Sequence, residues 1–111
     1  MTLTEAKEFL RNKYYNNCTC KEDVQKVIGN YAEECFGQKN MDAALAQLKK
    51  IQRTAMLMSP RGATEKSMNY MFTEFDKVIK KKKLAIIDDF SATTFIIMTI
   101  LSAEIEEEFD N

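Results

Sequence analysis

Apolar residues recur every three or four positions along most of the chain, which is the spacing of one face of an α-helix. The first such segment starts with a capping-box pattern, Thr2 followed by Glu5, and predicts a helix from about 3 to 15. Tyr15 is expected at the boundary between core and solvent. The predicted apolar face of this helix is Leu3, Ala6, Phe9, Leu10 and Tyr14.

Two further helical segments follow. Thr19 and Glu22 repeat the capping signature, and the second helix is expected to end at Gly37, since glycine suits a helix C-terminus. Asn40 is expected to cap a third helix, which ends at Ser59-Pro60 because proline disfavours helical geometry in the residue before it. The predicted core residues are Val24, Val27, Ile28, Tyr31, Ala32, Cys35 and Phe36, then Met41, Ala44, Leu45, Leu48, Ile51, Ala55 and Met58.

Two more helices are predicted in the C-terminal half. Thr64 is expected to cap the fourth, and its last turns carry Lys80 to Lys83, where cations complement the helix dipole. Asp88 or Asp89 is expected to cap a fifth helix over about 90–109, whose middle is apolar nearly all round, as in a buried central helix. The predicted apolar face of the fourth helix is Met68, Met71, Phe72, Phe75, Val78, Ile79 and Ile86.

The C-terminal segment leaves one alternative open. Residues 93–101 are rich in β-branched and aromatic side chains, and a strand pairing with 84–87 would give an α+β fold with a C-terminal hairpin at 84–101. A helix is favoured because no glycine or proline follows Lys83 to punctuate a hairpin. The sequence therefore predicts an all-α fold, a compact bundle of about five helices in one domain over 1–111.

Length and composition agree with this interpretation. The 111 residues, 45% hydrophobic and 30% charged, suffice for one core. Glu5 and Glu8 stand where a signal peptide would need a basic and then an apolar segment, and the apolar stretch 95–101 is far short of the ~20 residues of a membrane-spanning helix. With an odd number of cysteines, three, the chain is expected to be a cytoplasmic protein with reduced thiols and no membrane association.

The chain contains no histidine, which excludes Ser-His-Asp and Cys-His catalysis and every histidine-ligated metal site. Cys18, Cys20 and Cys35 are fewer ligands than a structural zinc site needs, and Cys-x-Cys is a weak redox signal. Carboxylate doublets such as Glu33-Glu34 point about 100° apart on a helix and do not converge. We therefore expect a non-enzymatic protein with no catalytic residue, metal site or cofactor. A metal-assisted carboxylate enzyme is the remaining enzymatic alternative.

Charge is divided unevenly along the chain. Residues 88–111 hold seven acids and no lysine or arginine, which gives −7 against +6 for residues 1–87. An acidic surface speeds encounter with a basic partner and repels nucleic acid. We therefore predict a binding protein for a basic partner such as a toxin nuclease, in the manner of an immunity protein or inhibitor. The predicted binding residues are Asp88, Asp89, Glu104, Glu106, Glu107, Glu108 and Asp110.

Two other features support alternatives. Lys77 and Lys80 to Lys83 indicate a nucleic-acid-associated regulator, although successive lysines spread around a helix and Glu74 and Asp76 dilute their charge. The methionines could form an adaptable groove for a partner helix, but core packing is favoured because all except Met56 fall on predicted core faces. The methionines in question are Met41, Met56, Met58, Met68 and Met71.

Overall fold

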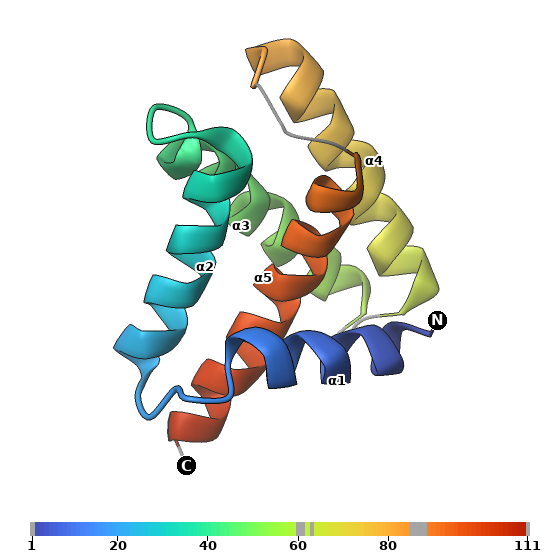
Figure 1. Cartoon of the computed structure of the whole chain (residues 1–111). Helices are drawn as coiled ribbons and strands as arrows, with labels where there is room; N and C mark the ends of the chain where they lie inside the picture. Colours follow the sequence, from blue (N-terminus) through green and yellow to red (C-terminus); the bar gives the residue numbers. More distant parts are fainter. Residues whose placement is uncertain (1, 60–61, 63, 85–88, 111) are drawn as a thin grey trace.

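The computed structural model describes residues 2–59, 62, 64–84 and 89–110. They form five helices (Figure 1): α1 (Leu3–Tyr14), α2 (Lys21–Phe36), α3 (Met41–Met58), α4 (Glu65–Lys82) and α5 (Asp89–Asp110). No strand occurs among these residues, so the predicted all-α fold is confirmed. Residues 93–101 belong to α5 and the α+β alternative is wrong, while 85–88 lie outside the described residues.

Two helix N-termini are capped as predicted. Thr2 Oγ1 accepts a hydrogen bond from the backbone N–H of Glu5 at 3.1 Å, and the Glu5 carboxylate accepts the N–H of Thr2. Thr64 forms the same reciprocal arrangement with Ser67, where such boxes usually have Glu or Gln. At the other end of α2, Gly37 adopts φ 82°, a conformation that glycine reaches without steric cost.

The start of α2 differs from the prediction. Cys20 is its N-cap residue, so Thr19 stands one position too early to bond the first turn. The N–H and the hydroxyl of Thr19 instead both donate to the Asp23 carboxylate at 2.9 Å, which lowers the pKa of Asp23. The predicted capping box at Thr19 is therefore wrong. Asn40 stands at the N-cap of α3 without capping it, because its amide donates to a carbonyl at the end of α2.

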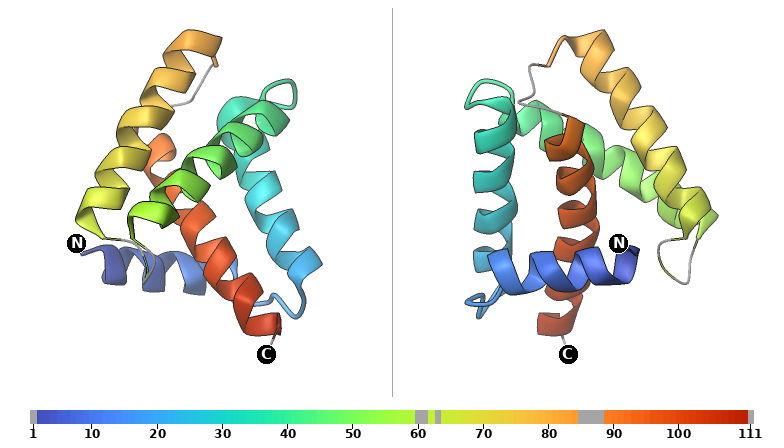
Figure 2. Two further views of the ribbon diagram at one scale, coloured as in Figure 1. Left: turned by 180° about the vertical axis from the view of Figure 1, so that it is seen from behind. Right: turned by 45° about the vertical axis from the view of Figure 1, so that its right-hand side comes forward.

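Helix α5 is the centre of the bundle. It contacts α1, α2, α3 and α4, and its residues 94–102 are buried except for Ile97, which is partly buried. In Figure 1, α2 runs beside α5, α1 crosses it at the front and α3 lies behind it; the views in Figure 2 show α3 passing α5 from the other side. The predicted central helix is therefore confirmed. None of the described helices combines the length and apolar character that crossing a bilayer requires.

An aromatic cluster joins three of the helices. Phe95 of α5, which is fully buried, lies with its ring centroid 5.2 Å from that of Phe36, 5.8 Å from that of Phe75 and 6.4 Å from that of Tyr31. Aromatic pairs of this kind stabilise by about 0.5–1.5 kcal/mol each beyond the area they bury. The cluster therefore fixes α2 and α4 on the N-terminal half of α5.

Three side chains lie elsewhere than predicted. Phe9 is 55% exposed, because α1 packs mainly on α5 and only a narrow stripe of it is covered. Met58, the last residue of α3, is 41% exposed. Tyr15 is only 4% exposed, because its hydroxyl reaches α5, where it donates to the carbonyl of Met98 and hydrogen-bonds the hydroxyl of Ser102.

Candidate protein-binding surface

The C-terminal half of α5 carries five of the seven acids predicted to bind a partner. They are Glu104, Glu106, Glu107, Glu108 and Asp110. Asp89 is the first residue of the same helix, about 30 Å from its C-terminal end at a rise of 1.5 Å per residue, and Asp88 lies outside the described residues. Asp89 is therefore not part of the surface that the other five acids form.

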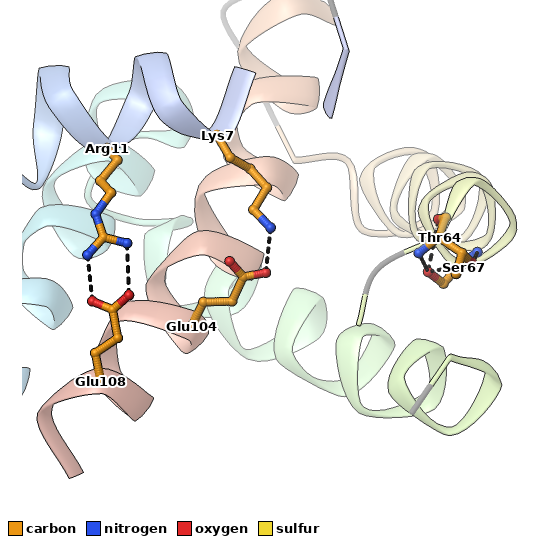
Figure 3. Close-up of polar contacts among 6 residues, drawn as sticks. All are labelled: Lys7, Arg11, Thr64, Ser67, Glu104 and Glu108. Atoms are coloured by element: carbon orange, nitrogen blue, oxygen red, sulfur yellow. Dashed lines mark hydrogen bonds and ion pairs between the residues drawn. The ribbon is translucent and has the colours of Figure 1, made fainter. Parts of the chain in front are cut away.

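Two of the five acids form ion pairs with α1 (Figure 3). Lys7 Nζ lies 2.6 Å from Glu104 Oε1, and the Arg11 guanidinium binds both carboxylate oxygens of Glu108. Lys7 and Arg11 are four residues apart on α1, so their side chains project from one face of that helix. Glu104 and Glu108 have the same spacing on α5 and likewise share one face. Arg11 lowers the pKa of Glu108, and Glu108 raises the pKa of Arg11, because each charge stabilises the other.

A third ion pair joins the end of α5 to the start of α2. Lys21 pairs with Asp110, and this contact raises the pKa of Lys21. In all three pairs the side chains are between 26% and 58% exposed, so water and salt screen them. Residues 88–111 contain no base, yet the fold supplies three from residues 7–21. The acidic end of α5 is thus partly neutralised within the molecule.

A hollow of about 510 Å³ lies between α3, α4 and α5. The apolar part of its lining is Ala55, Met56, Met71, Ile100 and Ala103, the polar uncharged part is Gln52, Ser59 and Ser67, and Gly62 also lines it. The charged residues of the lining are both acids, Glu104 and Glu107, and Glu107 is exposed. This hollow therefore combines apolar surface with an acidic rim on α5.

A second hollow of about 350 Å³ lies between α2, α3 and α5, and it shares Gln52, Met56 and Ala103 with the first. We call the two together the α3–α5 groove. The charges along it differ between its walls, with Lys49 and Arg53 on α3 and Glu106 on α5 in the second hollow. The remaining lining residues are Gln25, Ile28, Leu45, Thr99 and Ser102.

Sequence reasoning named Met56 as part of a possible helix-binding groove but missed most of the residues around it. Gln52 and Ala103 are one polar and one small residue on helix surfaces, and such positions carry no periodic signal. The apolar run Met56-Leu57-Met58 was the available sign, because three successive apolar residues cannot all face one core. In the structure Met56 is 58% and Leu57 82% exposed.

The lysine run lies at the C-terminal end of α4, which reaches the edge of the molecule far from the end of α5 (Figure 1). Lys77 pairs with Glu74 at 3.4 Å and Lys80 with Asp76 at 2.8 Å, both within α4. The three lysines at positions 81, 82 and 83 form no ion pair with any other described residue. This end of α4 is the more exposed of the two charged regions.

The cysteines occupy two environments. Cys35 is buried in the core, as its helical spacing predicted, while Cys18 and Cys20 lie partly buried just before α2. Burial raises the pKa of the Cys18 thiol, which favours the neutral form over the reactive thiolate. In the part of the chain that the structure describes, no three cysteine, aspartate or glutamate side chains gather to hold a metal ion.

No known protein family matches the sequence, and no curated protein or solved structure is significantly similar to it.

Proposed function

We propose that the protein is a non-enzymatic binding module that recognises a basic partner protein, such as a toxin nuclease, through the C-terminal half of α5. It would act as immunity proteins and inhibitors do, by masking the partner's surface. The observation that carries the proposal is the position of Glu106 and Glu107, which border apolar hollows on the side of α5 facing α3. Apolar surface next to charges of one sign is a combination that favours specific protein association.

The other acids have a different part in this proposal. Glu104, Glu108 and Asp110 hold the end of α5 against α1 and α2, so they support the surface. Recognition of the partner is assigned to Glu106 and Glu107, and the proposal does not need Asp88 or Asp89. A negative potential at this surface would steer a basic partner and raise its association rate, an effect that salt weakens.

The test is affinity capture from native lysate at low and moderate salt, with identification of bound proteins by mass spectrometry. We expect a stoichiometric basic protein that moderate salt releases. The variant Glu106→Lys/Glu107→Lys should then bind it with a much lower association rate and little salt dependence. The control Glu33→Lys/Glu34→Lys makes the same charge change at exposed sites on α2 and should bind normally. Equal binding by both variants would refute the proposal.

A second candidate function, nucleic-acid association, is favoured by one observation. Lys81 to Lys83 lie exposed at the edge of the molecule, with no ion pair to another described residue. The test is binding of a short DNA duplex over a range of salt concentrations. If the three lysines bind phosphates, Lys→Gln changes should lower the slope of log K against log salt by about 0.9 for each phosphate that is no longer neutralised. A slope that the three changes leave unaltered would exclude this function for them.

A further inference from the structure

We propose that the α3–α5 groove receives an amphipathic helix of the partner, with apolar side chains in the two hollows and opposite charges along its two flanks. This inference rests on the proposed function, which requires only a basic partner, and it specifies the element that is bound and the groove that binds it. Three observations support it: the shape of the groove, the charges on its walls and the exposed methionine at its centre.

The shape of the groove favours a helix as its occupant. No strand exists among the described residues, so this part of the protein offers no sheet edge to which a peptide could add as a strand. Both long walls of the groove are helices, and its two hollows meet at Gln52, Met56 and Ala103. A helix presents apolar side chains at i, i+3 or i+4, and i+7 along one face, which suits two adjacent hollows.

The wall charges specify the flanks of that helix. The α5 wall carries Glu106 and Glu107, whereas the α3 wall carries Lys49 and Arg53 in the second hollow. A complementary helix therefore has lysine or arginine on the flank that faces α5 and aspartate or glutamate on the flank that faces α3. A segment that is basic all round would be repelled by the α3 wall.

Methionine side chains give the groove a surface that can adapt. Met56 lines both hollows and is 58% exposed, while Met71 lines the first hollow and is buried. Methionine is flexible and polarizable, and surfaces that receive partner helices use it for that reason. An exposed Met56 between two hollows can therefore close around apolar side chains of different shapes.

The experiment is a selection of binding helices from a displayed library, with the whole 111-residue chain as the target. Each library helix has about 18 residues, or five turns, and its sequence varies along the apolar face and along both flanks of that face. We expect the selected helices to carry large apolar residues at helical spacing, with basic residues on one flank and acidic residues on the other. Selection of helices without this pattern, or of none, would overturn the inference.

Substitutions in the groove test where the selected helices bind. Met56→Glu and Ala103→Trp, at two exposed positions shared by the hollows, should weaken binding about 30-fold, the loss expected when a central anchor site is blocked. The control Leu57→Glu replaces the neighbouring exposed side chain, which lines neither hollow, and should retain full affinity. Unchanged affinity in Met56→Glu and Ala103→Trp would place the helix elsewhere and overturn the inference.

The outcomes separate this inference from the function on which it rests. Suppose that the groove substitutions do not change the affinity of the selected helices, and that capture of a basic protein depends on Glu106 and Glu107. The proposed binding function would then stand, and only the groove as its binding site would be refuted. Suppose instead that helix binding depends on Met56 and Ala103, and that Glu106→Lys/Glu107→Lys does not change capture from lysate. The groove would then stand as a helix-binding site, and recognition of a basic partner through these glutamates would be refuted.

Discussion

The two most highly charged segments of the chain differ in where their ion-pair partners lie. These segments are the acidic end of α5 and the lysine end of α4. The acids of α5 at 104, 108 and 110 pair with Lys7, Arg11 and Lys21, which are far away in the sequence. The ion pairs of the α4 lysines are with Glu74 and Asp76, three or four residues away on the same helix. The ion pairs of the acidic segment thus join different helices, whereas those of Lys77 and Lys80 with Glu74 and Asp76 lie within α4.

This difference shows that a run of like charge does not by itself indicate a binding surface. The sequence places its −7 charge where no base is nearby, yet folding brings three bases to it. Glu106 and Glu107 line the apolar α3–α5 groove, whereas Glu108 and Asp110 line neither of its hollows. Glu104 also lines the first hollow, but it pairs with Lys7 of α1. The proposed partner site is therefore placed where charge borders apolar surface, and not where the total charge is highest.

The largest expected effect is on the packing beneath the acidic end of α5. Ile105 is 3% exposed, so Ile105→Ala should lower the free energy of unfolding by about 3 kcal/mol. Ile79 is partly buried and directly precedes the lysine run. The matching change Ile79→Ala should lower the free energy of unfolding by only about 1 kcal/mol, because it removes less buried apolar surface. Urea unfolding measures both. Equal decreases would show that the two ends are equally integrated into the core.

Alkaline titration gives the next effect, through Tyr15. Burial raises the pKa of Tyr15 to about 12, against about 10 in the unfolded chain, and the hydrogen bond from Ser102 opposes this only in part. The folded state therefore holds the phenolic proton more tightly, so stability is full below pH 10 and falls as the pH rises through 12, by about 2–3 kcal/mol at most.

The variant Tyr15→Phe tests the source of that fall. It should flatten the decline between pH 10 and 12 and cost about 1–2 kcal/mol at neutral pH, because Ser102 and the Met98 carbonyl no longer have the phenol as a partner. Part of the alkaline decline should remain, because burial also raises the pKa of Tyr31. An undiminished decline in Tyr15→Phe would contradict the assignment.

A smaller effect is expected from the ion pair between Arg11 and Glu108. A double-mutant cycle with alanine should give a coupling energy of about 0.5–1 kcal/mol at low salt, which falls towards zero near 1 M salt. Because Arg11 lowers the pKa of Glu108, this stabilisation is present above the unfolded pKa and is lost as the pH falls through the folded one. Coupling that is absent at every salt concentration would mean that α1 is held to α5 by packing alone.

The smallest effect on stability is expected from the lysine end of α4. Replacing Lys81 to Lys83 by glutamine should change the free energy of unfolding by less than about 0.5 kcal/mol, because exposed side chains without ion pairs to other described residues contribute little. Thermal unfolding by circular dichroism is the measurement. A marked decrease in stability would show that these lysines, like the acids of α5, take part in the tertiary structure.

The sequence predicted what depends on local periodicity and missed what depends on neighbours. The boundaries of all five helices were close to those observed because burial of one helix face leaves a regular pattern. The exposure of Phe9 and the burial of Tyr15 depend on how α1 lies across α5, which no pattern within α1 encodes. The pairs of Lys7 and Arg11 with α5 join residues 97 positions apart, so composition along the chain could not reveal them.

The most direct test of the central claim compares the two charged ends in one affinity capture from native lysate at low salt. Wild type, Glu106→Lys/Glu107→Lys and Lys81→Gln/Lys82→Gln/Lys83→Gln would be used as baits in parallel. We expect wild type and the lysine variant to capture the same basic protein and the glutamate variant to capture none of it. Capture that is abolished in the lysine variant and kept in the glutamate variant would contradict the claim and assign binding to α4.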